Sequence, residues 1–308
     1  MMTGQPLTLD LLRAHFGAAV QEHVALAPYT SARIGGAADL LVTVKSVDEL
    51  AQSVTLLREA GIRFIILGGG SNVLVSDQGV REVVVLNKAK SVRFEEGGQP
   101  KVRAESGASF SQLGHRAASR GLSGLEWAAT VPGTVGGAVY GNAGAFGGDV
   151  AHTLICTELL TEQGRETWTV GKMGYGYRTS SLKRGEVQAV ILAAEFALNH
   201  ATKQEASVKI EGFSVRRKAT QPPGASMGSM FKNPEGDYAG RLIEAAGLKG
   251  TRIGNAEISP VHGNFFINHG ETKAADVRSL IERVQRTVEQ KFGVALELEI
   301  ELLGEWSS

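Results

Sequence analysis

The hydrophobic and polar positions of the chain predict both helices and strands. Residues 40–86 predict a β-α-β unit with a strand at 40–44, a helix after residue 46, and strands at 63–67 and 83–86. Ser46 and Glu49 form a capping box before the helix, and Gly61 stands where a left-handed C-terminal residue is expected. The strand at 63–67, which is continuously apolar after Arg63, is predicted to be buried.

Residues 91–200 predict short strands around one helix. A second capping box, Ser109 with Gln112, begins that helix, and Gly121 lies near its end. The apolar stretch 187–198 predicts either a pair of strands or one long buried strand. Polar residues at 200–205 then indicate a boundary.

Beyond that boundary, residues 238–246 predict a helix ended by Gly247. Residues 274–292 form the clearest helical pattern, which Gly293 stops. Its apolar face consists of Val277, Leu280, Ile281, Val284, Val288 and Phe292. Residues 294–302 alternate strictly and predict a strand with Glu297, Glu299 and Glu301 on one face.

Composition narrows the functional classes. The 308 residues include 32 basic and 32 acidic side chains, which argues against nucleic-acid or membrane-surface binding driven by bulk charge. The single cysteine, Cys156, fits a reducing compartment, and no Cys/His cluster indicates a metal site. Because neither a signal pattern nor a bilayer-spanning apolar run occurs, we expect a cytoplasmic protein.

Glycine is the compositional outlier, with 39 residues gathered in clusters. The first cluster follows the 63–67 strand and comprises Gly68, Gly69, Gly70, Ser71 and Asn72. Successive backbone N–H groups after a strand can bind a phosphate, and the hydroxyl and amide add donors. The sixth position from Gly68 is Val73, so the Rossmann fingerprint fails. A tight turn between strands is the alternative.

The second cluster lies in residues 131–148. Glycine occupies positions 133, 136, 137, 141, 144, 147 and 148. Glycine weakens the interior of a helix or strand, so we expect neither regular structure here. The segment is also apolar and uncharged, which favours a backbone wrapped around a large buried ligand. A close-packed crossing of two backbones is the alternative.

These segments resemble the FAD-binding region of the vanillyl-alcohol-oxidase type flavoproteins, and specifically of the UDP-N-acetylenolpyruvoylglucosamine reductases. Six motifs occur in that family's order. They are Leu67–Leu74, Pro132–Gly148, the Tyr-Arg-x-Ser element Tyr177–Ser180, the Gly-Ser-x-Phe-Lys-Asn-Pro element Gly228–Pro234, the His-x-Asn-Phe element His262–Asn268, and Glu299-Ile300. Any one of them alone would be weak evidence for the family.

The resemblance implies an α+β fold in which a two-lobed PCMH-type FAD-binding domain precedes a C-terminal α+β substrate-binding domain. We expect the lobes at 1–86 and 87–200 and the substrate domain at 201–308. No segment between Phe231 and Gly270 matches the inserted lid loop of one family branch. The chain therefore resembles the shorter, loop-less branch.

The resemblance also implies the cofactors and the reaction. FAD would carry a hydride from NADPH to the enolpyruvyl group of UDP-N-acetylglucosamine enolpyruvate, giving UDP-N-acetylmuramate for peptidoglycan, and thereby serving cell-wall biogenesis and division. Gly68, Gly69, Gly70, Ser71 and Asn72 would hold the pyrophosphate. The residues expected along the flavin and its linker are Val131, Pro132, Gly133, Gly136, Gly137, Asn142, Ala143 and Gly144.

Three residues would be catalytic by this resemblance. Ser229 would protonate the substrate carbon, a task for which a serine needs a partner or relay. Arg178 would pair with the substrate carboxylate, and Glu299, in protonated form, would donate to the same developing charge. Without the resemblance, Arg178 is equally an ordinary surface arginine, Ser229 a turn serine, and Glu299 part of a solvated charge ladder.

The expected substrate contacts are Tyr177, Lys218, Lys232, Asn233 and Asn264. Arg216 and Arg217 compete with Lys218 for the diphosphate. We expect His262 to bond to backbone and Met230 to pack. Small molecules are the only partners expected, and the protein is expected to be monomeric.

Two alternatives stay open. One is an oxidase of the same superfamily acting on an alcohol or sugar. Many such enzymes tether their flavin through a histidine, but the glycine segments hold none, and His152 lies just beyond them. The other is a flavin or sugar-nucleotide binder without turnover.

Overall fold

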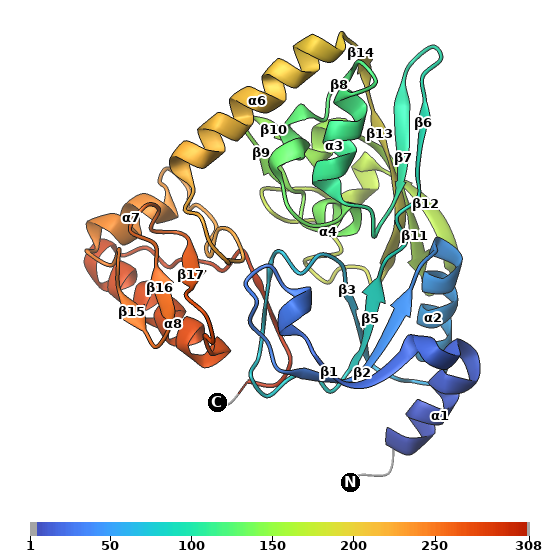
Figure 1. The fold of residues 1–308 in the computed structure, drawn as a ribbon, viewed down its shortest axis with the longest axis horizontal. Helices are drawn as coiled ribbons and strands as arrows, with labels where there is room; N and C mark the ends of the chain where they lie inside the picture. Colours follow the sequence, from blue (N-terminus) through green and yellow to red (C-terminus); the bar gives the residue numbers. More distant parts are fainter. Residues whose placement is uncertain (1–4, 307–308) are drawn as a thin grey trace. The chain divides into compact units, whose positions relative to one another are not determined.

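The computed structural model describes residues 5–306 of the chain. Its mixture of helices and strands agrees with the predicted α+β class (Figure 1). The chain divides into two compact units, each assembled from segments distant in sequence. The first comprises Met1–Val20, Val42–Gly69 and Val84–Arg216, and the second Gln21–Leu41, Gly70–Val83 and Arg217–Ser308. The division at residues 86 and 200 stays a prediction.

The first sheet has the strand order β1-β2-β5-β3. Its strands are Val20–Ala25, Ala37–Val44, Val83–Asn87 and Phe64–Leu67. The helix α2, Val47–Glu59, follows β2, so the predicted β-α-β unit is confirmed. The Ser46 hydroxyl accepts a hydrogen bond from the Glu49 N–H at 3.1 Å, and Gly61 adopts φ +65°. In β3 only Leu67 is fully buried, so the predicted burial is wrong for the rest of that strand.

An antiparallel sheet of five strands, in the order β12-β11-β13-β7-β6, belongs to the first unit. Its strands are Gly164–Thr169, Leu154–Thr161, Val190–Ala197, Lys101–Glu105 and Val92–Glu95. The apolar stretch at 187–198 therefore forms one long strand, β13, which selects one of the two predicted alternatives.

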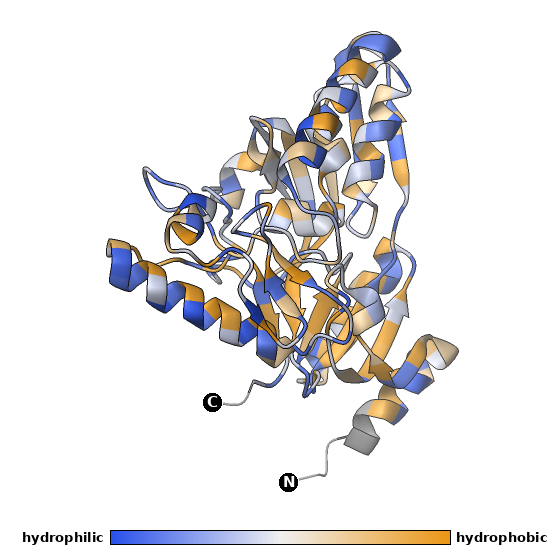
Figure 2. Ribbon diagram, turned by 60° about the vertical axis from the view of Figure 1, so that its left-hand side comes forward, coloured by the Kyte–Doolittle hydropathy of each residue, from blue (hydrophilic) through white to orange (hydrophobic). Residues whose placement is uncertain are grey.

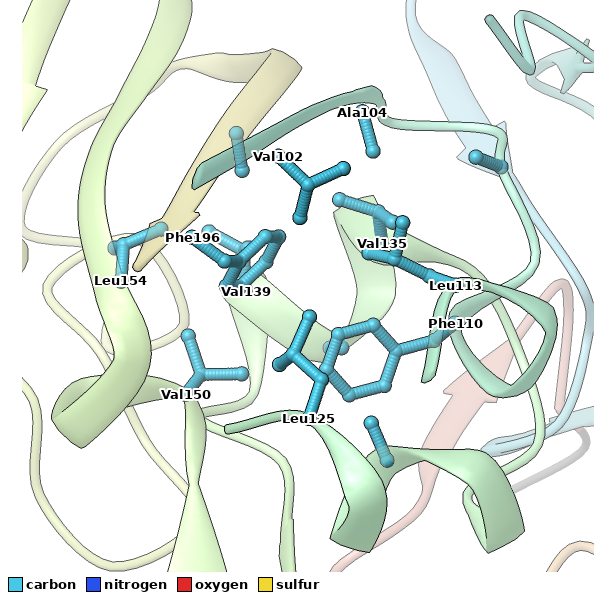
Figure 3. Packing of buried hydrophobic residues seen from close by; sticks show 14 of the residues in the cluster. Val102, Ala104, Phe110, Leu113, Leu125, Val135, Val139, Val150, Leu154 and Phe196 are labelled. Atoms are coloured by element: carbon cyan, nitrogen blue, oxygen red, sulfur yellow. The ribbon is translucent and has the colours of Figure 1, made fainter. Parts of the chain in front are cut away.

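The core of the first unit packs around two short helices, α3 (Phe110–Ala118) and α4 (Val135–Tyr140). Ser109 caps α3 as predicted, accepting from the Gln112 N–H. The rings of Phe110 and Phe196 lie 5.8 Å apart, and Figure 3 shows them with Val135 and Val139 of α4. All four side chains are fully buried, so burial of a glycine-rich helix stabilises this unit.

The remaining elements of the first unit are short. They are α1 (Gln5–Phe16), η1 (Gly17–Ala19), β8 (Leu122–Ser123), η3 (Glu126–Thr130), β9 (Gly144–Ala145), β10 (Gly148–Asp149), α5 (Val150–Thr153), η4 (Val170–Met173) and β14 (Asn199–His200). Strand β8 pairs with β14, and β9 pairs with β10.

The second unit contains a three-stranded sheet, a parallel strand pair, two α-helices and a short 3-10 helix. The elements are η2 (Ala27–Tyr29), β4 (Val73–Val75), α7 (Ala239–Ala245), β15 (Arg252–Ile253), β16 (Ala256–Ile258), β17 (Phe266–Asn268), α8 (Ala274–Phe292) and β18 (Glu301–Leu303). Strands β15, β16 and β17 pair in that order, and β18 pairs with β4. Hydrophobic and hydrophilic residues alternate along the helices in Figure 2, whereas some strands are hydrophobic along their length.

Helix α8 begins and ends where the sequence predicted, with Gly293 at φ +69° as its left-handed C-cap. Its apolar face is buried except for Phe292, which is 38% exposed, so that residue was assigned wrongly. The strand predicted at 294–302 is also wrong in extent, because regular pairing covers only β18.

Helix α6, Lys203–Thr220, begins in the segment predicted as a boundary. The change from the first unit to the second falls within this helix, between Arg216 and Arg217. Among the described residues, no helix combines the length and apolar character needed to cross a bilayer.

Candidate functional site

The two glycine clusters meet in the first unit. A Cβ atom added to Gly68 would lie 2.5 Å from the Thr134 hydroxyl oxygen, and one added to Gly69 would lie 2.9 Å from the Gly133 Cα. Real Cβ atoms do not approach other atoms so closely, so only glycine fits at both positions. The two loops predicted to bind FAD are therefore adjacent, and close backbone approach explains two of their glycines.

Helix α4 corrects one prediction about the second cluster, because part of it is regular. A Cβ added to Gly136 would lie 2.9 Å from the Ser106 Cβ, so this glycine lets the helix sit against that strand end. The N–H groups of Val135 and Gly136 donate to the carbonyls of Ala108 and Ser106 at 2.9 and 2.8 Å. Tertiary contacts thus offset the weak helix propensity of glycine.

Gly137 differs from its neighbours. It is exposed, and an added Cβ would find only the Thr134 hydroxyl, 3.7 Å away. No described protein atom therefore requires glycine here, and the space over it remains open for a ligand. The two predicted explanations therefore concern different glycines of this segment. Close packing of two backbones explains Gly136, whereas space for a ligand explains Gly137. Thr134 lies next to both Gly68 and Gly137. It was not predicted as a site residue, although its position inside the Pro-Gly-Thr-Val-Gly-Gly run could have indicated it.

Trp127 is a second residue that sequence analysis did not select. A Cβ atom added to Gly148 would overlap the Trp127 ring, so close packing also explains this glycine. The indole N–H is buried and has no hydrogen-bond acceptor among the described residues. Such groups usually bond to something when buried, so the donor suits a ligand with polar edges. With the open space over Gly137, this segment fits a dinucleotide cofactor such as FAD.

Asn142, Ala143 and Gly144 lie in the second half of the cluster, beside a tight turn. Asn142 is buried with φ +46°, and its side-chain oxygen accepts from the Ala151 N–H at 3.0 Å. Its side-chain nitrogen donates to the Gly176 carbonyl at 3.0 Å. Asn142 therefore fixes the turn that carries Arg178, since the backbones of Gly176 and Thr179 bond to each other across that turn.

Arg178 is half-buried and also adopts a left-handed conformation, at φ +56°. Its Nη2 donates to the Gly144 carbonyl at 2.8 Å, and its guanidinium carbon lies 5.8 Å from the centre of the Tyr177 ring. Tyr177 itself is 57% exposed. Strained backbone of this kind persists where the surroundings determine it and is enriched at functional sites.

In the second unit, Ser229 lies between two neighbouring segments. Ser229 pairs with Phe265 in a single antiparallel β-bridge. The backbone carbonyl of the next residue, Met230, accepts a hydrogen bond from the Glu299 N–H at 2.9 Å. The predicted catalytic residues Ser229 and Glu299 are thus on adjacent backbone segments. Met230 is fully buried and packs, in agreement with its assignment.

The glycine-loop residues of the second unit have protein partners. The Asn72 side-chain nitrogen donates to the Glu299 carbonyl at 2.9 Å, and its carbonyl accepts the Glu301 N–H at 2.9 Å. Gly70, at φ +58°, packs its Cα against the Tyr29 carbonyl, leaving no room for a side chain. Asn72 therefore orients the backbone that carries Glu299, a contact between residues far apart in sequence.

The glutamates of the predicted charge ladder differ in exposure and in their partners. Glu297 is exposed and pairs with Lys232 at 3.1 Å, whereas Glu299 is half-buried. Lys232, predicted to contact substrate, thus already has an acidic neighbour. Asn233 accepts the Ala239 N–H at 3.1 Å at the start of α7, and Lys218 is exposed on α6.

Asn264 is 3% exposed and braces the segment beside Ser229. Its side-chain oxygen accepts the Phe231 N–H at 2.9 Å, and its nitrogen donates to the Phe231 carbonyl at 2.8 Å. His262 bonds to backbone as expected, since the Asn264 N–H donates to its Nδ1 at 3.2 Å. Burial, and secondarily Lys249, lowers the pKa of His262.

Sequence reasoning also missed Asp77. Its carboxylate accepts the N–H groups of Ala274 and Ala275 at 2.8 and 2.9 Å, so it caps α8 from a distant part of the chain. Between residues 5 and 306, no group of three or more His, Cys, Asp or Glu side chains has the arrangement needed to hold a metal ion.

Comparison with known proteins covers most of the chain. Residues 38–169 match the model of an FAD binding domain, and residues 219–303 match that of the UDP-N-acetylenolpyruvoylglucosamine reductase C-terminal domain. The chain is 41% identical over 280 residues to the UDP-N-acetylenolpyruvoylglucosamine reductase of Chloroflexus aggregans, covering 89% of this chain and 94% of that protein. A second such enzyme, from Symbiobacterium thermophilum, is 44% identical over 280 residues, covering 90% and 89%.

A solved structure agrees with these matches. The crystal structure of UDP-N-acetylenolpyruvylglucosamine reductase from Thermus caldophilus is similar to this one with a TM-score of 0.77 and 36% identity. The similarity covers 91% of this chain and 97% of that one.

Proposed function

Because the chain belongs to the UDP-N-acetylenolpyruvoylglucosamine reductase family, we propose that it reduces UDP-N-acetylglucosamine enolpyruvate to UDP-N-acetylmuramate with NADPH. The observation that carries the proposal is the fixed position of Arg178, whose guanidinium bonds to the glycine segment matched by the FAD-binding model. An anion-binding group beside the cofactor segment suits a substrate with a carboxylate next to its reacting carbon.

The cofactor is FAD, which when bound accepts a hydride from NADPH and delivers it to the substrate. The loop at 68–72, Thr134 and the open face over Gly137 are the proposed contacts. Protein atoms pack closely against Gly68, Gly69 and Gly136, so the fold itself holds their backbone in place. Backbone held in this way can contact a ligand with little further loss of conformational freedom.

Arg178 would bind the substrate carboxylate and stabilise the charge that spreads from it during reduction. Its turn is fixed by Asn142 and its guanidinium by the Gly144 carbonyl. A cation held in place gains more from a developing negative charge than one that must reorient. An ordinary surface arginine would not need two such contacts to hold it.

Ser229 would hold the proton that goes to the substrate carbon, with Glu299 nearby as a donor to the enol-like charge. Support comes from their adjacent backbones, joined through the bond between the Glu299 N–H and the Met230 carbonyl. A serine hydroxyl is a weak acid, so the proton has to be replaced through a neighbouring group or water.

The remaining substrate contacts are proposed from position and charge. Tyr177 and Lys218 are exposed, and Lys232 and Asn233 lie three and four residues after Ser229. Asn264 is proposed to act by holding Phe231 in place, since its amide is occupied there. We also propose a monomer acting in the cytoplasm, with an FAD domain in lobes 1–86 and 87–200 and a substrate domain at 201–308.

The visible spectrum of the purified protein tests the proposal during anaerobic additions. NADPH should bleach the flavin band, and enolpyruvyl-UDP-N-acetylglucosamine should restore it. A band restored only by oxygen would favour an oxidase of the same superfamily. A colourless protein that cannot be reconstituted with FAD would contradict the cofactor assignment. The Arg178→Ala and Ser229→Ala variants should slow the second step, whereas a binder has no rate to lose.

A further inference from the structure

A hairpin beside Arg178 has an unexpected residue at its tip. Strands β9 and β10 pair Gly148 with Ala145 and Asp149 with Gly144, which leaves Phe146 and Gly147 as the two-residue turn. Both adopt left-handed conformations, with φ +53° and +86°. Turns of this kind favour asparagine or glycine at the first position, and a bulky aromatic residue there is strained.

Contacts with helix α6 explain why an aromatic residue is tolerated at the tip. The Phe146 ring stacks on the Phe213 ring with centroids 4.9 Å apart and planes 11° apart. The guanidinium carbon of Arg216 lies 5.7 Å from the centre of the Phe146 ring. Phe213 and Arg216 are three residues apart and therefore lie on one face of α6. The helix thus anchors the tip of the hairpin.

The base of the same hairpin holds Arg178. The Gly144 carbonyl accepts the Arg178 Nη2 at 2.8 Å, and Gly144 is itself paired with Asp149. The opposite strand is fixed because Gly148 packs directly on the Trp127 ring. With one strand fixed by Trp127, the direction of the Gly144 carbonyl depends on where the tip is held.

We propose that Phe213 and Phe146 are positioning residues for Arg178, with α6 setting its orientation toward substrate through the hairpin. The inference rests on the proposed function, because it assigns a kinetic consequence to the position of Arg178. Loss of the stack should slow reoxidation of the reduced flavin by the enolpyruvyl substrate. It should leave flavin reduction by NADPH nearly unchanged, because that step does not need a group bound to the substrate carboxylate.

The Phe146→Asn substitution separates a positioning role from a merely structural one. An asparagine–glycine pair is the preferred sequence for this turn, so the hairpin should form at least as well as before. The ring that reaches α6 is nevertheless lost. We expect unchanged or raised thermal stability together with a reoxidation rate lower by about 3- to 10-fold, the range that corresponds to the coupling of a stacked aromatic pair.

Stopped-flow measurement of the two half-reactions provides the test. Phe213→Leu should slow reoxidation by a similar factor, Phe213→Tyr should restore it, and Phe292→Leu, on α8, serves as the matched control. A wild-type protein whose flavin is not reoxidised by the enolpyruvyl substrate would contradict the proposed function itself. Normal wild-type turnover with unchanged reoxidation in Phe146→Asn and Phe213→Leu would overturn only the positioning role. Equal slowing of both half-reactions would also overturn it.

Discussion

Replacement of Asn264 by alanine tests whether this residue braces the segment beside Ser229 or contacts substrate. In the native protein the Asn264 amide forms two hydrogen bonds with the backbone of Phe231, at 2.9 and 2.8 Å. Phe231 is fully buried, so water cannot easily replace either bond. Alanine would leave both an N–H and a carbonyl of Phe231 without these partners.

The expected loss follows from those two groups. A buried polar group deprived of its partner costs about 1–3 kcal/mol, so the substitution should destabilise the second unit by about 2–6 kcal/mol. That is a large share of the stability of an ordinary domain, which is about 5–15 kcal/mol. The matched control is Asn255→Ala, because Asn255 is exposed and donates one bond to the Gly270 carbonyl at 2.8 Å. We expect that control to lose about 1 kcal/mol or less.

Hydrogen exchange in increasing urea is the appropriate assay, since a chain of two units need not unfold in one step. Amides in residues 228–234 should lose protection in Asn264→Ala at lower urea than in the control. The KM for the sugar nucleotide should change little in protein that remains folded. Equal protection in the two variants, together with a raised KM, would refute the brace and favour direct substrate contact.

Three further predictions follow from local geometry. Gly148→Ala should destabilise the first unit by about 1–3 kcal/mol in thermal unfolding, because the new methyl group overlaps the buried Trp127 ring; an unchanged Tm would contradict this packing. Burial lowers the pKa of His262 from 6.5, so the folded state binds fewer protons than the unfolded chain, and stability should fall as the pH drops below about 6.5. His262→Gln should flatten that part of the pH profile, and an equally steep profile would exclude His262 as its source. Asp77→Ala should cost about 1–2 kcal/mol in urea unfolding, because the N–H groups of Ala274 and Ala275 lose their acceptors, and Asp77→Asn should lose part of this because it keeps one of the two accepting oxygens; unchanged stability in Asp77→Ala would contradict capping.

The sequence predicted best those elements whose signals are local. Helix α8 was correct at both ends because its apolar spacing and its terminal glycine are properties of the helix itself. The strand predicted at 294–302 is longer than the observed strand β18, because alternation within one segment does not indicate where its partner strand ends. Its partner β4 lies more than 200 residues earlier and offers only three residues for pairing.

The glycine clusters show the same distinction within the site. The sequence indicates the two glycine segments, but not which of their glycines pack against another part of the chain and which face open space. Gly68 and Gly136 are needed because another part of the chain lies against them, whereas Gly137 faces open space. That difference depends on contacts between segments about 65 residues apart for Gly68 and about 30 residues apart for Gly136, which no local pattern encodes. The same is true of Asn264, whose partner is 33 residues away.

The parallel pairing of β4 with β18 also bears on how the chain folds as it is synthesised. The second unit needs segments from the first third of the chain together with its last residues, whereas the first unit needs nothing beyond Arg216. Pairings of long sequence separation form slowly, because a long loop must close before they contribute stability. The first unit can therefore acquire its core while the ribosome is still at work. Ala32, Ile34 and Leu74 belong to the hydrophobic core of the second unit, so they remain uncovered until the C-terminal residues of that core have been synthesised. During this interval the nascent chain is prone to aggregate, and a chaperone that covers exposed apolar segments would act on it.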